Sequence, residues 1–249
     1  MVLKSVIFDV DGTLADTELD GHLWAFNHVF QQWKLPFRWS ISLYRELLKI
    51  PGGQERLAYY QMLHPERVPL SAAQIAEIHQ VKTSLFIQRV RAGAIPLRIG
   101  VRSLISACYE QHIPVAIATT TQYANVEALL ITHFGPQWRK IFPVVVAGDH
   151  VVQKKPHPCV YHECLQRLGV APDEAVAFED SAVGLMAARQ AGIPTVVTMN
   201  IWTYHQSFPD ALGVLTGIGT YKNPAFGRGP HGWGRYCLNP KQLEEWLTQ

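Results

Sequence analysis

The sequence predicts an α/β fold, a doubly wound parallel sheet with a small all-helical domain inserted after the first strand. Three observations lead to this prediction. Short apolar runs alternate with helical patterns along most of the chain, the runs do not alternate with polar residues, and one long segment near the amino terminus has no good strand. Strands buried on both faces lose their polar alternation, which is typical of parallel sheets covered by helices.

Five apolar runs are predicted to be the buried strands. Each is rich in Val, Ile and Ala, as β-branched and small residues are in such strands. The runs are Ser5–Val10, Ile113–Thr120, Phe142–Gly148, Glu174–Asp180 and Ile193–Met199.

Helical patterns separate these runs. Arg98–Gln111 carries apolar residues at helical spacing on one face. Pro158–Leu168 and Ser181–Ala191 are each followed by a glycine, Gly169 and Gly192, and glycine just after a helical pattern marks the end of a helix.

The stretch from Ala15 to about Gly93 breaks the alternation. It contains several helical patterns, one of which begins with Ser71 and Gln74 at capping-box spacing. This stretch is far longer than an ordinary strand-to-helix loop. An insert at this position overhangs the carboxyl end of the first strand, where open α/β sheets bind ligands.

These patterns divide the chain into three parts. We expect a core domain of residues 1–15 and 94–216 and a helical insert of residues 16–93. A carboxyl-terminal extension, residues 217–249, is rich in Gly, Pro and aromatic residues and is expected to pack on the core. Its last segment, Pro240–Leu247, has a helical pattern.

Composition excludes several classes of function. The formal net charge is +2 and no block of like charge occurs, which argues against nucleic acid as a partner. The four cysteines lack CxxC spacing, and no run approaches the roughly 20 apolar residues of a membrane span. We expect a monomeric cytoplasmic protein; an organelle stroma would apply if a targeting peptide had been removed.

Two aspartates, Asp9 and Asp11, end the first strand two residues apart. Alternate residues of a strand share a face, so both carboxylates enter one cleft. Two like charges at such a short separation need a neighbouring cation or a shared proton. Mg²⁺ suits the position because it prefers oxygen ligands and binds through one or two carboxylates together with a substrate phosphate. The pair therefore predicts a metal and phosphoryl site.

Other strand ends supply matching groups. Glu179 and Asp180 close the fourth run, although acids there also suit a helix N-terminus. Thr119 lies at the tip of the second run and offers a hydroxyl to a phosphoryl oxygen. After the third run, Lys155 precedes a proline that favours an extended backbone, and a lysine is a compact charge for phosphate.

The motifs DVDGT, a strand-end Thr, KKP and FEDS, in this order, resemble the four motifs of the haloacid dehalogenase (HAD) superfamily. The resemblance implies a Rossmann-like core and a covalent mechanism. Asp9 would be the nucleophile and Asp11 the acid and base, with Thr119 and Lys155 binding the phosphoryl group. It also implies that Mg²⁺ is held by Asp9, the backbone carbonyl of Asp11, Glu179 and Asp180. The insert resembles the small helical cap that closes over such sites.

Longer segments are similar to the CbbY group, relatives of β-phosphoglucomutase associated with carbon fixation. The similarity runs through about Phe208 and includes the segments ADTELDGHLWAFNHVF, LYRELLKIPGGQERLAYY and IATTTQYANVEALL. It implies a phosphatase acting on a phosphorylated sugar, notably xylulose 1,5-bisphosphate. The residues implied to contact the substrate are Glu18, Tyr44, Arg56, Thr120 and Asn125, with His22 and Thr121 as further candidates.

Alternatives stay open on the sequence. A sugar phosphomutase of the β-phosphoglucomutase kind would use the same Asp9 and Asp11, and a small phosphatase of broad specificity is a third reading. A non-catalytic protein on the same fold would be expected to lack one of the acids. One departure from the family pattern is Cys159, where relatives often carry an acid shortly after the lysine motif.

Overall fold

A computed structural model describes residues 2–50, 52–65 and 69–248 of the chain. Its strands form one eight-stranded sheet in the order β3-β2-β1-β4-β5-β6-β7-β8. Pairing is parallel from β3 to β6, and β7 and β8 are antiparallel. The strands are β1 (Ser5–Phe8), β2 (Val115–Ala118), β3 (Val144–Val146), β4 (Ala175–Glu179), β5 (Thr195–Thr198), β6 (Gly213–Leu215), β7 (Ala225–Gly229) and β8 (Gly232–Tyr236).

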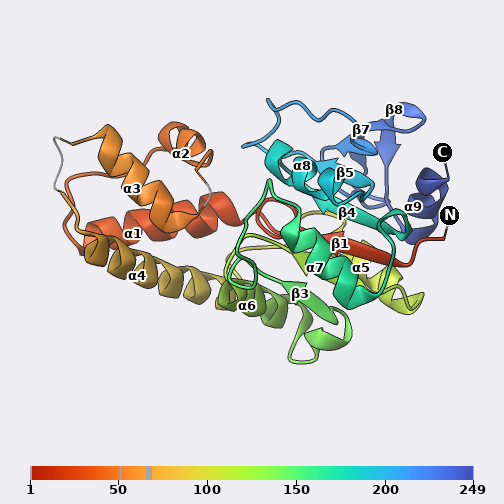
Figure 1. The fold of residues 1–249 in the computed structure, drawn as a ribbon, viewed down its shortest axis with the longest axis horizontal. Helices are drawn as coiled ribbons and strands as arrows, with labels where there is room; N and C mark the ends of the chain where they lie inside the picture. Colours follow the sequence, from red (N-terminus) through yellow and green to blue (C-terminus); the bar gives the residue numbers. More distant parts are fainter. Residues whose placement is uncertain (1, 51, 66–68, 249) are drawn as a thin grey trace.

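Helices cover both faces of the sheet, which confirms the predicted fold class (Figure 1). Alternate residues of β1 show the two layers, because Val6 and Phe8 pack into one apolar cluster and Ile7 into another. The first cluster includes residues of α5 (Val101–Glu110), α6 (Tyr123–Phe134) and α9 (Pro240–Leu247), and the second includes residues of α7 (Cys159–Leu168) and α8 (Ala182–Gln190). Short 3₁₀ turns lie at Trp138–Lys140 and Pro172–Glu174.

The insert is helical in all of its regular elements among the described residues. It begins with a π-helical turn, and Ser71 and Gln74 form the expected capping box at the start of its last helix. Many of its residues pack into an apolar cluster of their own, while Phe86 and Val90 of its last helix pack into the cluster of the core. The helices of the insert lie to one side of the sheet (Figure 1). The elements are the turn Glu18–Leu23, α1 (Trp24–Gln32), α2 (Ile41–Leu47), α3 (Gly53–Leu63) and α4 (Ala72–Arg91).

The two connections between insert and core run side by side. Arg98 donates its backbone N–H to the carbonyl of Leu14 at 3.0 Å, and Ala15 pairs with Leu97 in an antiparallel bridge. Both connections therefore enter the core next to the end of β1. This places the helices of the insert beside the edge of the sheet at which the parallel strands end.

The extension contains more regular structure than the sequence indicated. The expected helix is present as α9, but β7 and β8 also extend the sheet beyond β6. This hairpin was not predicted because glycines occupy most of the inward positions of both strands. The glycines leave room for aromatic rings, since a Cβ on Gly229 would lie 2.9 Å from the indole of Trp246. None of the helices among the described residues combines the length and apolar character that a membrane span requires.

Candidate active site

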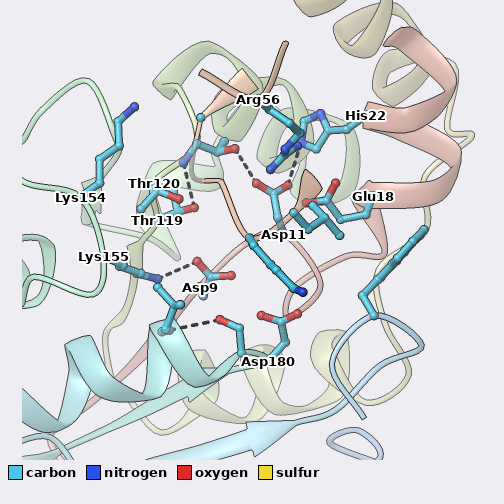
Figure 2. A pocket seen from close by; sticks show the side chains of 18 of the residues that line it. Asp9, Asp11, Glu18, His22, Arg56, Thr119, Thr120, Lys154, Lys155 and Asp180 are labelled. Atoms are coloured by element: carbon cyan, nitrogen blue, oxygen red, sulfur yellow. Dashed lines mark hydrogen bonds and ion pairs between the residues drawn. The ribbon is translucent and has the colours of Figure 1, made fainter. Parts of the chain in front are cut away.

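The functional side chains gather where the parallel strands end. Asp9 follows β1, Thr119 follows β2, and Glu179 is the last residue of β4. Because β1 lies between β2 and β4, these three chain segments meet at one point of the sheet edge (Figure 2). A cavity of about 650 Å³ opens there, lined by residues of both the core and the insert.

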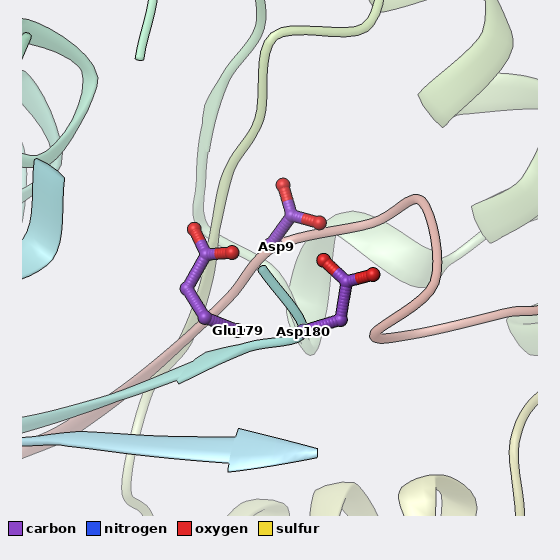
Figure 3. Close-up of side chains that lie close together, drawn as sticks. All are labelled: Asp9, Glu179 and Asp180. Atoms are coloured by element: carbon purple, nitrogen blue, oxygen red, sulfur yellow. The ribbon is translucent and has the colours of Figure 1, made fainter. Parts of the chain in front are cut away.

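Asp9, Glu179 and Asp180 form a buried cluster of carboxylates. One oxygen of each lies within 4.8 Å of the others, and all three side chains point toward a common space (Figure 3). Burial and the charge of Glu179 raise the pKa of Asp9 to about 7 against the opposing effect of Lys155. Burial, Asp9 and Glu179 raise the pKa of Asp180 well above its usual value. Such a set of oxygen donors needs positive charge, which fits Mg²⁺.

Lys155 supplies part of that charge from the loop after β3. Its ammonium donates to Asp9 Oδ1 at 2.7 Å, to Glu179 Oε1 at 2.6 Å and to the carbonyl of Ala118 at 2.8 Å. Burial opposes its charge, but the two carboxylates raise the pKa of Lys155 above its usual value. Lys155 therefore stays charged beside Asp9. Lys154 also lines the cavity and pairs with Glu55 of the insert at 3.5 Å.

Asp11 lies apart from the carboxylate cluster and is surrounded by donors. Its Oδ1 accepts from the hydroxyl of Thr17 and lies 3.2 Å from His22 Nε2, and its Oδ2 accepts from the hydroxyl of Thr121. Burial alone would raise the pKa of Asp11, but His22 and the two hydroxyls hold it below its usual value. In this arrangement Asp11 is a carboxylate. The predicted substrate candidates His22 and Thr121 thus contact Asp11, and Figure 2 shows His22 beside it.

The insert presents two of the predicted substrate residues to the cavity. Glu18 and Arg56 line it, whereas Tyr44 is fully buried and is not part of its lining. The Tyr44 hydroxyl donates to Glu18 Oε2 at 2.6 Å and accepts from Arg56 Nη1 at 2.9 Å. Tyr44 therefore positions the side chains of Glu18 and Arg56 from the side that faces away from the cavity. Arg56 also donates to the carbonyls of Leu47 and Ile50.

The segment after β2 contributes the remaining predicted residues. Thr119, Thr120 and Asn125 all line the cavity. The Thr119 hydroxyl accepts from the backbone N–H of Thr121 at 3.2 Å, which leaves its proton available to a ligand. Asn125 is buried, and its Oδ1 finds no hydrogen-bond partner in the described part of the chain. A buried amide oxygen without a partner is costly, so a ligand donor is expected there.

Comparison with known proteins agrees with this geometry. Residues 6–198 match the family model of haloacid dehalogenase-like hydrolases. The chain is 45% identical over 225 residues to the plasmid-encoded protein CbbY of Cupriavidus necator, covering 89% of this chain and 88% of that protein.

The chain belongs to the haloacid dehalogenase-like hydrolases. Within them it is similar to CbbY of Rhodobacter sphaeroides, whose crystal structure in complex with phosphate is 42% identical. That structure has a TM-score of 0.81 and covers 87% of this chain and 95% of its own. A variant of the same protein in complex with xylulose 1,5-bisphosphate is 41% identical, with the same TM-score and coverage. The chain is accordingly a phosphoric monoester hydrolase of this family, and the CbbY-like assignment is confirmed.

The haloacid dehalogenase-like site also contains groups that sequence reasoning missed. Lys82 of α4 is buried and lies 2.9 Å from Nδ1 of His22. Because an ammonium only donates, Nδ1 is the acceptor and the ring proton sits on Nε2, which faces Asp11. The available signal was the spacing of Ile78, Lys82 and Phe86, which puts a lysine on the buried stripe of the helix.

Three further positions hold the loop after β1. Gly12 has a φ of +80°, and a Cβ there would lie 2.4 Å from Asp180 Oδ2. Asn200 donates to Asp180 Oδ2 at 2.7 Å and to the Gly12 carbonyl at 3.2 Å. Arg98 donates to the same carbonyl and to the carbonyls of Thr198 and Met199. Of these three positions, only Gly12 belongs to a motif that the sequence analysis used, DVDGT.

Proposed function

We propose that this chain is a Mg²⁺-dependent phosphatase that hydrolyses a sugar bisphosphate, with xylulose 1,5-bisphosphate as its substrate. The observation that carries the proposal is the distribution of charge along the cavity. Asp9, the other cluster carboxylates and Lys155 lie at the core end, and the cationic side chains of Arg45, Lys49 and Arg56 lie on the insert. Two separated cationic groups match a sugar with a phosphate at each end.

The acid cluster, the phosphate-binding groups and the insert suit these roles. Asp9, the backbone carbonyl of Asp11, Glu179 and Asp180 are the proposed Mg²⁺ ligands. When bound, Mg²⁺ supplies positive charge that offsets the negative charge of the carboxylates and the phosphoryl oxygens. The insert acts as a cap that excludes water, and its Glu18 and Arg56 contact the sugar and its distal phosphate.

The proposed reaction has two steps. Asp9 attacks phosphorus while Thr119 and Lys155 bind the phosphoryl oxygens, and the bond to the sugar oxygen breaks as Asp11 gives that oxygen a proton. Water then gives a proton to Asp11 and attacks the aspartyl phosphate, which releases inorganic phosphate. The contacts of Asp11 hold its pKa low and keep it ionised, so Asp11 must take up a proton from solvent before the first step. The negative charge of an arriving phosphate raises the pKa of Asp11 and favours that uptake, and the proton that water later gives to Asp11 restores it for the next turnover.

The setting follows from the same similarity. CbbY proteins share most of the chain, so we place this phosphatase in carbon fixation, as a monomer in the cytoplasm or in an organelle stroma. The alternative is a sugar phosphomutase of the β-phosphoglucomutase kind, which would use Asp9 and Asp11 but return the phosphoryl group to the sugar.

A substrate panel with product analysis tests the proposal. Purified protein is incubated with sugar monophosphates and bisphosphates, with Mg²⁺ and with EDTA, and both free phosphate and isomerised sugar are measured. We expect free phosphate, a preference for xylulose 1,5-bisphosphate, and loss of turnover in EDTA that Mg²⁺ restores. Preference for monophosphates would overturn the substrate, and an isomerised monophosphate as the product would establish the mutase.

A further inference from the structure

A tight turn after β5 connects the metal side of the site to the insert. The turn, Asn200–Thr203, is fixed by its own hydrogen bonds. The Asn200 Oδ1 accepts from the backbone N–H of Trp202 at 2.8 Å and from the hydroxyl of Thr203 at 3.2 Å. Its Nδ2 donates to Asp180 Oδ2 and to the carbonyl of Gly12. One amide side chain therefore joins the conformation of the turn to the orientation of a proposed metal ligand.

The other end of the turn belongs to the insert. Although Trp202 lies in the core part of the sequence, it is 7% exposed and packs within the apolar cluster of the insert. Its ring meets the ring of Tyr44 edge to face, with centroids 5.8 Å apart. The guanidinium of Arg45 donates to the carbonyl of Ile201 at 3.4 Å. A movement of the insert relative to the core would therefore displace Trp202 or break these contacts.

Tyr44 extends the connection to the substrate side. Its hydroxyl holds both Glu18 and Arg56, the two cap residues proposed to contact the sugar. A continuous series of contacts thus runs from the substrate residues through Tyr44 and Trp202 to Asn200, and from there to Asp180. Every member is buried or half-buried, so packing leaves little freedom for independent movement.

We propose that Asn200 and Trp202 are positioning residues that couple closure of the insert to assembly of the metal site. Trp202 moves with the insert because it packs against it, and Asn200 orients Asp180 and the Gly12 carbonyl. The inference rests on the proposed function, because it takes the carboxylate cluster as the Mg²⁺ site. By linkage, substrate that holds the insert closed tightens Mg²⁺ binding, and Mg²⁺ tightens substrate binding by the same factor.

Calorimetric titration with Mg²⁺ alone tests the role of Asn200 without any substrate. Partners that orient a ligand typically change metal affinity 10- to 100-fold when removed. We expect Asn200→Ala to weaken Mg²⁺ binding by on the order of tenfold. Asn223→Ala, at an exposed asparagine of the extension, is the matched control and should bind as the wild type does. Wild-type affinity in Asn200→Ala would overturn the orienting role.

The role of Trp202 is tested by the coupling between the two ligands. The apparent Mg²⁺ constant is measured at low and at saturating concentrations of the best substrate from the panel, or by titration with inorganic phosphate if no ester is turned over. The ratio of the two constants is the coupling factor. We expect Trp202→Ala to lower this factor by on the order of fivefold while leaving Mg²⁺ binding without ligand within about twofold.

Two further variants keep the test decisive. Trp202→Phe retains an aromatic ring against Tyr44 and should keep more of the coupling, even if the alanine variant does not fold. Tyr204→Ala removes an exposed ring of the following segment and should leave the factor unchanged. A wild-type coupling factor of one, or equal factors in the wild type and both Trp202 variants, would contradict the proposal. Failure of xylulose 1,5-bisphosphate in the panel would overturn the substrate alone, because the Mg²⁺ titrations do not depend on it.

Discussion

Lys82 gives the sharpest stability prediction because it is a charged group on the buried stripe of α4. Its ammonium lies against the rings of Phe26 and Phe86 and bonds only a neutral ring nitrogen of His22 among the described residues. Burial lowers the pKa of Lys82 from 10.5 to about 8, even though Glu18 and Asp11 favour its charge. The fold therefore tolerates this charge at a cost.

The size of that cost follows from the pKa. The difference between a pKa of 10.5 and one of about 8 corresponds to about 3 kcal/mol. Because the folded value is the lower one, the unfolded chain binds more protons between about pH 8 and pH 10.5. The free energy of unfolding of the wild type therefore increases as the pH rises through that window. Below about pH 8 the buried charge of Lys82 destabilises the fold by the full amount.

Lys82→Met removes the charge and keeps the length of the side chain. The stability difference between Lys82→Met and the wild type should be most favourable to the variant at pH 7 and fall by about 2 kcal/mol by pH 10. The unpaired Nδ1 of His22 costs about 1–3 kcal/mol at both pH values and so cancels from this change. Turnover should drop at least roughly tenfold, because His22 loses the contact that fixes its proton toward Asp11.

Urea unfolding followed by circular dichroism at pH 7 and pH 10 measures the effect. Lys140→Met, at an exposed lysine, is the control and should show the same difference from the wild type at both pH values. If the stability difference between Lys82→Met and the wild type is equally independent of pH, burial does not lower the pKa of Lys82 as its surroundings imply.

Two positions in the loop network give further predictions. Gly12→Ala places a Cβ against Asp180 at a backbone position with left-handed conformation. We expect the free energy of unfolding to fall by about 1–2 kcal/mol and Mg²⁺ activation to weaken at least roughly tenfold. Unchanged Mg²⁺ activation would show that the loop tolerates a Cβ. Arg98→Lys loses the guanidinium group that donates to several backbone carbonyls. We expect the free energy of unfolding to fall by about 2 kcal/mol and kcat to decrease. The control Arg102→Lys, on the exposed side of α5, should match the wild type. Equal unfolding curves for the two arginine variants would contradict the bracing role of Arg98.

The core of the fold was predictable because its information is local. Buried parallel strands are short apolar runs, and their ends are marked by the polar residues that follow, as with Asp9 after β1 and Glu179 at the end of β4. The alternation of strands and helices then fixes which ends meet. Sequence alone could therefore bring the acids, Thr119 and Lys155 to one edge of the sheet.

The rest depends on contacts between distant segments. Lys82 and His22 are 60 residues apart, and Asn200 and Gly12 are 188 apart, so no local pattern links them. Tyr44 was expected to contact substrate, but its place behind Glu18 and Arg56 follows from how the helices of the insert pack. The hairpin of β7 and β8 escaped notice because its inward glycines give no apolar alternation.

Transfer of a phosphoryl group to Asp9 is the step on which the proposed function depends. The direct measurement is an acid quench of protein mixed with xylulose 1,5-bisphosphate and Mg²⁺, followed by digestion and mass spectrometry of the peptide that contains Asp9. The proposed mechanism predicts one phosphoryl group on Asp9, absent without Mg²⁺ and absent from an inactive Asp9→Asn variant. Near-normal turnover by Asp9→Asn, or turnover with the phosphoryl group on another residue, would contradict it.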